Sequence, residues 1–254
     1  MKTIITSISV FFFVYSFSAQ CTLNSSQISS KTYLSSTGNN QLDNLIQLEK
    51  SNLERFFKVN IDLKIYSGSN GLASKRCYNQ NCNGTIILGK QLLLNEFNKR
   101  GPKTNEKLGK YMIVAILAHE FAHIYQYKHP EFKFKNSVIQ EIHADMLAGW
   151  YMSKYLINKF QITNDDFVFG LYGNEKIDKA SDIMMDMRIG FGWMGDEQYW
   201  SPQHHGDYFT RVSAFGEAWT CMRGSGVQIS CKSFSEWLKD SIWLAELKYY
   251  HDQN

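Results

Sequence analysis

Residues 115–126 read AILAHEFAHIYQ, and the pentapeptide HEFAH at positions 119–123 decides how the chain is interpreted. Two histidines four residues apart lie on one face of a helix, one turn from each other. That spacing lets His119 and His123 bind one zinc ion. It also places Glu120 beside the ion, where a carboxylate can accept a proton from water.

The residues before the motif indicate that this helix is buried. Residues 112–118 form an unbroken apolar run, and the polar residues follow without a turn signal. A helix that is apolar on all sides belongs in a core. Burying two histidines and a carboxylate there is costly unless they are paired or bound to a metal. The alternative interpretation is two core histidines with hydrogen-bonding neighbours and a buried ion pair.

A catalytic zinc ion needs a third protein ligand. His129 lies ten residues after His119, as the third histidine of metzincins does, but Gln126 stands where that pattern needs a glycine to end the helix. Glu141 is favoured, because a helix from Ser137, antiparallel to the first, brings it to the depth of His123.

Two further residues lie close to Glu141 in sequence. His143 is about 200° around the helix from Glu141, so the two cannot both face the metal. Asp145 shares the face of Glu141 and is expected to accept the free N–H of a zinc-bound histidine, fixing its tautomer.

The N-terminus and the cysteines indicate export. Residues 1–19 have the form of a signal peptide, with Lys2, a short apolar stretch and small residues before the cut. Cys21 raises the alternative of a lipid anchor, which the preceding Gln20 disfavours. Two pairs of cysteines close in sequence are expected to form disulfides, Cys77 with Cys82 and Cys221 with Cys231.

Composition predicts one domain at 40–254, after an N-terminal arm at 20–39 that is expected to be flexible. The net charge of +3 is dispersed, which argues against nucleic acid as a partner. No stable membrane insertion is expected once the leader is removed.

Periodicity and turn signals predict strands at 61–66 and 85–88, and helices at 41–57, 90–99, 104–128, from 137, 180–189, 208–221 and 234–250. The expected fold is α+β and mostly α, with a small N-terminal sheet, a central active-site helix and a helical C-terminal half. A capping box of Ser137 and Gln140 is expected at the start of the second long helix.

The sequence also resembles a known family. H-E-F-A-H-x-x-Q at 119–126, followed by E-x-x-A-D-x-x-A-G at 141–149, resembles the gluzincin metallopeptidases. It is especially similar to bacterial neutral zinc metallopeptidases, which carry H-E-[FY]-[GA]-H-x-x-Q and then E-L-Q-A-D-x-x-A-G. The resemblance implies a zincin-like fold and one catalytic Zn²⁺ held by His119, His123 and Glu141. It further implies that Glu120 is the general base.

We therefore expect a secreted or periplasmic zinc metallopeptidase that cuts a protein or peptide substrate. His205, Tyr208 and Arg211 are candidates to stabilise the oxyanion, with His205 favoured because it precedes a helix start and resembles the family's His-Gly segment. The strand at 85–88 is a candidate sheet edge for the peptide. Two alternatives are an exported, non-hydrolytic binding protein with a zinc-stabilised fold, and a zinc hydrolase acting on a non-peptide or cell-wall amide.

Overall fold

A computed structural model describes residues 32–251 except 105–106, 133, 135, 164–165, 167–173, 195–206 and 224–233. The predicted signal peptide, Cys21 and His205 lie outside the described residues. The described chain is α+β and mostly helical, with a small N-terminal mixed sheet, as the sequence predicted.

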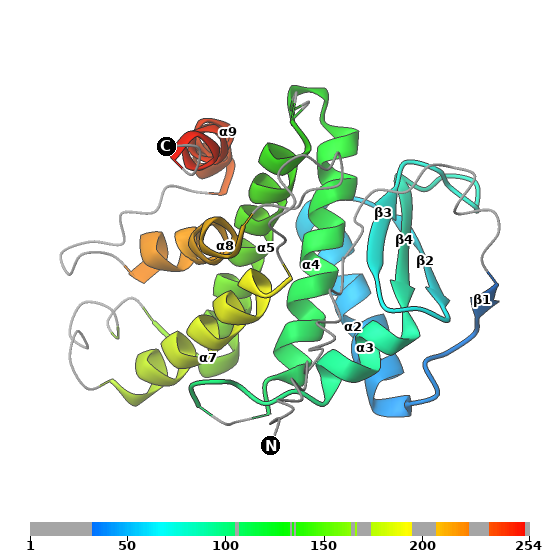
Figure 1. The fold of residues 1–254 in the computed structure, drawn as a ribbon, viewed down its shortest axis with the longest axis horizontal. Helices are drawn as coiled ribbons and strands as arrows, with labels where there is room; N and C mark the ends of the chain where they lie inside the picture. The colour runs from blue at the N-terminus through cyan, green and yellow to red at the C-terminus, as the bar shows by residue number, and fades with distance from the viewer. Residues whose placement is uncertain are drawn as a thin grey trace, which may run out of the picture.

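Helix α4 (Gly109–Lys128), which carries the HEFAH motif, runs through the middle of the molecule (Figure 1). The sheet lies on one side of it, and the helices of the C-terminal half lie on the other. All residues from Tyr111 to Gln126 are buried, because neighbours cover the helix on every side. This confirms the buried helix that the apolar run predicted.

The sheet has four strands in the order β1-β2-β4-β3. β2 (Ile61–Tyr66) and β4 (Gly84–Gly89) are parallel, whereas β1 (Tyr33–Leu34) and β3 (Gly71–Ser74) pair antiparallel to them. β4 is internal, so the expectation that 85–88 form a sheet edge is wrong. The edge next to α4 is β3, which the periodicity did not predict because it has only four residues. β1 falls within the segment predicted to be a flexible arm.

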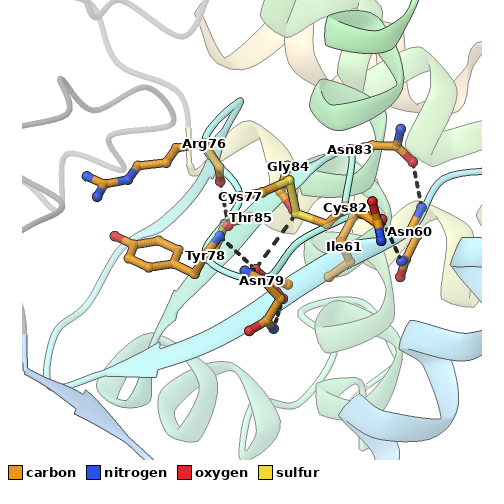
Figure 2. The surroundings of a disulfide bond; sticks show 12 residues. Asn60, Ile61, Arg76, Cys77, Tyr78, Asn79, Cys82, Asn83, Gly84 and Thr85 are labelled. Atoms are coloured by element: carbon orange, nitrogen blue, oxygen red, sulfur yellow. Dashed lines mark hydrogen bonds between the residues drawn. A yellow bond between two sulfur atoms is a disulfide. The ribbon is translucent and has the colours of Figure 1, made fainter.

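The loop between β3 and β4 is closed by the predicted Cys77–Cys82 disulfide (Figure 2). Asp62 on β2 organises this loop by accepting the backbone N–H groups of Tyr78, at 2.8 Å, and Asn79, at 2.6 Å. Cys221 is also disulfide-bonded, and its expected partner Cys231 lies outside the described residues.

The remaining helices surround α4. Helices α2 (Asn40–Phe57) and α3 (Lys90–Phe97) pack on it from the N-terminal half, and α5 (Ser137–Phe160) and α7 (Glu175–Gly192) from the C-terminal half. Helix α8 (Tyr208–Arg223) packs against α5 and α7, and α9 (Phe234–His251) against α5. A 3₁₀ turn, η1 (Pro130–Phe132), follows α4. Within the described part of the chain, no helix is both long and apolar enough to span a bilayer.

One predicted helix start and one predicted helix cap were wrong. α4 begins at Gly109 rather than near Thr104, because the buried carboxylate of Asp186 on α7 binds the preceding loop through the backbone N–H of Lys103 and both the N–H and hydroxyl of Thr104. α5 begins at Ser137, but its cap is Asn136, which accepts the Val138 N–H at 2.7 Å. An asparagine in that position satisfies the first turn as well as a capping box does.

The close packing of α5 against α8 gives a testable prediction about Gly149. A Cβ at Gly149 would lie 1.9 Å from the Phe215 carbonyl oxygen, which is backbone and cannot move aside alone. Gly149→Ala should therefore lower the free energy of unfolding by about 1–3 kcal/mol or more, because about 1–3 kcal/mol is the usual cost of overpacking. Urea denaturation measures this cost.

Gly190 provides the matched control, because it is also a helical glycine but its added Cβ would meet only the end of the flexible Met112 side chain. Gly190→Ala should be the milder of the two substitutions, since the Met112 side chain can rotate away. Equal destabilisation by the two variants would contradict the backbone contact at Gly149.

Candidate metal centre

Three side chains from two helices converge at the middle of α4. His119 Nε2 lies 3.1 Å from His123 Nε2 and 3.2 Å from Glu141 Oε2, and His123 Nε2 lies 3.3 Å from Glu141 Oε1. All three residues are buried. The antiparallel packing of α4 and α5 brings Glu141 to the depth of the histidines, as the helix positions predicted.

These separations fit a tetrahedral metal ion. Two ligand atoms that each lie about 2 Å from a tetrahedral zinc ion are roughly 3.3 Å apart. The observed separations of 3.1, 3.2 and 3.3 Å are close to this value, with the two contacts of Glu141 made by different carboxylate oxygens, and one ligand atom from each of the three residues lies within 4.8 Å of the others. The arrangement is compatible with one metal ion bound by all three residues.

Asp145 contacts the His119 ring on the side opposite the convergence point, which is the place where the side chains of His119, His123 and Glu141 meet. Its Oδ1 lies 2.8 Å from His119 Nδ1, where the sequence predicted such a partner. Arg211 from α8 binds the same carboxylate with two bonds of 2.7 Å, from Nε to Oδ2 and from Nη2 to Oδ1. Burial opposes the charge of Asp145, but Arg211 and His119 outweigh it and hold its pKa below the usual value. An ionised Asp145 requires His119 to donate from Nδ1, which leaves the Nε2 lone pair for a metal.

Gln126 performs the same task for His123. Its Oε1 lies 2.9 Å from His123 Nδ1, and its amide nitrogen donates to the Gln140 carbonyl oxygen at 2.9 Å. A carbonyl oxygen only accepts, so the amide nitrogen faces Gln140 and the amide oxygen faces His123. His123 therefore donates from Nδ1, and its Nε2 lone pair also points to the convergence point.

The charges around the convergence point favour a cation. Glu120, Glu141 and Asp145 are all buried, and Arg211 is the buried cation that balances one of them. Burial lowers the pKa of His119, but hydrogen bonds and attraction from Asp145 and Glu141 outweigh this and raise it to about 10. The carboxylates thus stabilise positive charge at the Nε2 of His119, and a divalent metal ion would compete with a proton for that position.

A cavity of about 230 Å³ opens beside His119 and Glu120. Glu120 is 2% exposed, and a Cβ at Gly71 on the edge strand β3 would lie 2.8 Å from its Oε1. The start of β3 therefore passes directly over Glu120. Several apolar side chains line the cavity: Leu92, Ile116, Phe191, Trp193 and Met194.

Two histidines that the sequence set aside as third ligands lie away from the group. His129 caps the end of α4 and pairs with Glu131 at 3.0 Å near the surface. His143 is fully buried, but its ring faces Gln126 and Ser241 rather than the other histidines.

The three oxyanion candidates have different outcomes. Tyr208 is half-buried with its ring beside Gly192, and it is not among the residues that line the described cavity. His205 lies outside the described residues, so its role stays a prediction. The N–H groups of Phe209 and Thr210 at the start of α8 are bound by Asp207, so an anion there would have to displace a carboxylate. Arg211 lines the cavity, but it is buried and its guanidinium is bound to Asp145.

Sequence reasoning missed two functional contacts. Gln126 entered as the residue that replaces a glycine and as the last letter of the family motif, but not as a partner of His123, although its position three residues after His123 places both on one helix face. That spacing could have identified it. The pairing of Arg211 with Asp145 spans 66 positions, and no local pattern signals it.

Comparisons with known proteins give no family for the chain: no family model, no curated protein and no solved structure matches it. The interpretation of the site therefore depends on its own geometry.

If the three converging residues hold a divalent ion, metal should stabilise the fold. An ion that binds only the folded state at 100 times its Kd adds about 2.7 kcal/mol. For a domain of this size that corresponds to a rise in Tm of roughly 5–10 °C. Calorimetry of the protein with added zinc and with added chelator measures the difference.

Two variants separate the proposed ligands from a bystander histidine. Glu141→Ala should abolish the effect of zinc on Tm, because it removes one of three ligands. His129→Ala should keep that effect, because His129 lies at the end of α4. The reverse pattern would refute the ligand set.

Proposed function

We propose that this protein is an exported, zinc-dependent metallopeptidase of the gluzincin type. The observation that carries the proposal is the convergence of His119, His123 and Glu141 beside Glu120 at the wall of a cavity. Two histidines and one carboxylate are the ligand set of several catalytic zinc sites. When bound, zinc supplies Lewis-acid chemistry that activates water and polarises a carbonyl group.

The protein's own side chains would do the remaining work. Glu120 is proposed to accept a proton from the attacking water and to pass it to the leaving amine. Asp145 and Gln126 hold the two imidazoles with their Nε2 lone pairs directed at one point. Arg211 keeps Asp145 ionised and fixes its orientation with two hydrogen bonds.

A peptide substrate fits the surroundings of Glu120. The edge strand β3 begins above this residue, and an extended peptide can add to a sheet edge through backbone hydrogen bonds. The apolar lining of the cavity suits a large hydrophobic side chain better than a glycan. This favours peptide hydrolysis over the alternative of a cell-wall amide.

A purely structural zinc site is the weaker alternative. Structural zinc is normally closed by four protein ligands. Among the residues that the structure describes, the group that could hold a metal has three members. The non-hydrolytic binding protein is thus disfavoured. Export is supported by the Cys77–Cys82 disulfide, because such bonds persist in oxidising compartments.

The proposal predicts that Glu120→Gln separates metal binding from hydrolysis. Glutamine has the size of glutamate but cannot accept the proton, so kcat should fall by at least about 100-fold, the lower range for general-base catalysis. Zinc content should stay at the wild-type level, because Glu120 is not among the three converging ligands. Cleavage of a peptide library and metal analysis of the same samples measure both quantities.

Glu49→Gln is the matched control. Glu49 is also a buried glutamate, 3% exposed, but it accepts from Tyr151 between α2 and α5. This variant should retain cleavage. If Glu120→Gln cleaves as fast as wild type, the peptidase proposal fails. Cleavage of peptidoglycan fragments but not of peptides would favour the cell-wall alternative.

A further inference from the structure

We propose that Gln126, His143 and Ser241 form a hydrogen-bonded chain that fixes the tautomer of His123 and thereby couples the C-terminal helix α9 to metal affinity. The inference rests on the proposed metal centre at His119, His123 and Glu141. The three residues of the hydrogen-bonded chain come from three helices: Gln126 from α4, His143 from α5 and Ser241 from α9. Each is a positioning residue that acts through His123.

The outer end of the chain is fixed by a backbone carbonyl. Ser241 on α9 donates its hydroxyl proton to the Leu238 carbonyl oxygen at 2.7 Å. A hydroxyl has one proton, so toward His143 Nε2, at 2.9 Å, the Ser241 oxygen can only accept. His143 must therefore carry a proton on Nε2.

The inner end is fixed by a second backbone carbonyl. The Gln140 carbonyl oxygen orients the amide nitrogen of Gln126, and this nitrogen also lies 2.9 Å from His143 Nδ1. An amide nitrogen only donates, so Nδ1 of His143 must be the acceptor. Both ends thus require the same neutral tautomer of His143, with its proton on Nε2, and the two requirements are independent.

The direction of the chain determines the state of His123. With both protons of the Gln126 amide directed to Gln140 and His143, the amide oxygen accepts from His123 Nδ1 at 2.9 Å. The Nε2 of His123 is then left with its lone pair toward Glu141 and His119. A rotation of the Gln126 amide would place oxygen against the Gln140 carbonyl oxygen, and the chain opposes it.

The surroundings keep this chain isolated from water. Gln126, His143 and Ser241 are each buried, and the His143 ring packs against Phe132 and Phe134, with centroids 4.9 and 5.0 Å away. Buried polar bonds without competing water hold their geometry strongly. Aromatic packing alone would not select a tautomer, because either tautomer of a neutral imidazole has the same shape.

The first test needs no mutation. Long-range ¹H–¹⁵N spectra of histidine-labelled protein distinguish a proton on Nδ1 from one on Nε2. We expect His143 to be protonated on Nε2 and His123 on Nδ1, and single substitutions assign the two signals by their disappearance. A proton on Nδ1 of His143 would overturn the proposal.

The second test is zinc affinity, measured by competition with a chromophoric chelator. His143→Phe keeps a ring between the two phenylalanines but removes both hydrogen bonds. It should weaken zinc binding by about tenfold, at the low end of the loss seen when a partner of a metal-bound histidine is removed. Ser241→Ala should weaken it less in the same direction, and should cause no further loss when added to His143→Phe.

Ser153→Ala is the matched control, because Ser153 is equally buried and gives a similar 2.7 Å bond to a carbonyl of its own helix, that of Gly149. It should leave zinc affinity unchanged. If His143→Phe binds zinc as tightly as wild type, the chain has no role and the proposal is overturned, while the metal centre stands. If wild-type protein binds no zinc, the metal centre itself is refuted and this inference falls with it.

Discussion

The requirement that buried polar groups be satisfied governs this structure more than any other constraint. α4 is covered on all sides and carries two histidines and a glutamate in its middle. Each unsatisfied polar atom there would cost about 1–3 kcal/mol. The two imidazoles have partners from two sources: Asp145 on α5 for His119, and Gln126 on α4 itself for His123. These partners meet the part of that cost that the two imidazoles would carry.

The two imidazoles are held in different ways. His119 donates to an ionised carboxylate, whose charge is balanced by Arg211 from α8. His123 donates to a neutral amide whose orientation is set by the backbone of α5. A carboxylate makes its histidine more basic, whereas an amide mainly orients it. Asp145 thus places a negative charge beside His119, whereas Gln126 places none beside His123.

What the sequence predicted well depended on local spacing. The i, i+4 histidines, and Asp145 four residues after Glu141, follow from helix periodicity and a short connection, and the structure places them as expected. What it missed depended on contacts between distant segments. Asp186 delays the start of α4 by binding a loop more than eighty positions away, and β3 exists only because β4 pairs with it. Neither effect leaves a periodic signal in its own segment.

The difference between local spacing and contacts of distant segments also explains why the C-terminal half matters to the candidate metal centre. The three converging ligands lie within 119–141, so a short hairpin of α4 and α5 would contain all of them. Their orientations, however, depend on Arg211 of α8 and Ser241 of α9. These two residues bind Asp145 and His143 on α5. In the complete fold Asp145 is fully buried, and without the guanidinium of Arg211 its charge there would be strongly unfavourable. The motif supplies the ligands, and the later helices are needed because only a complete shell of partners makes their burial stable.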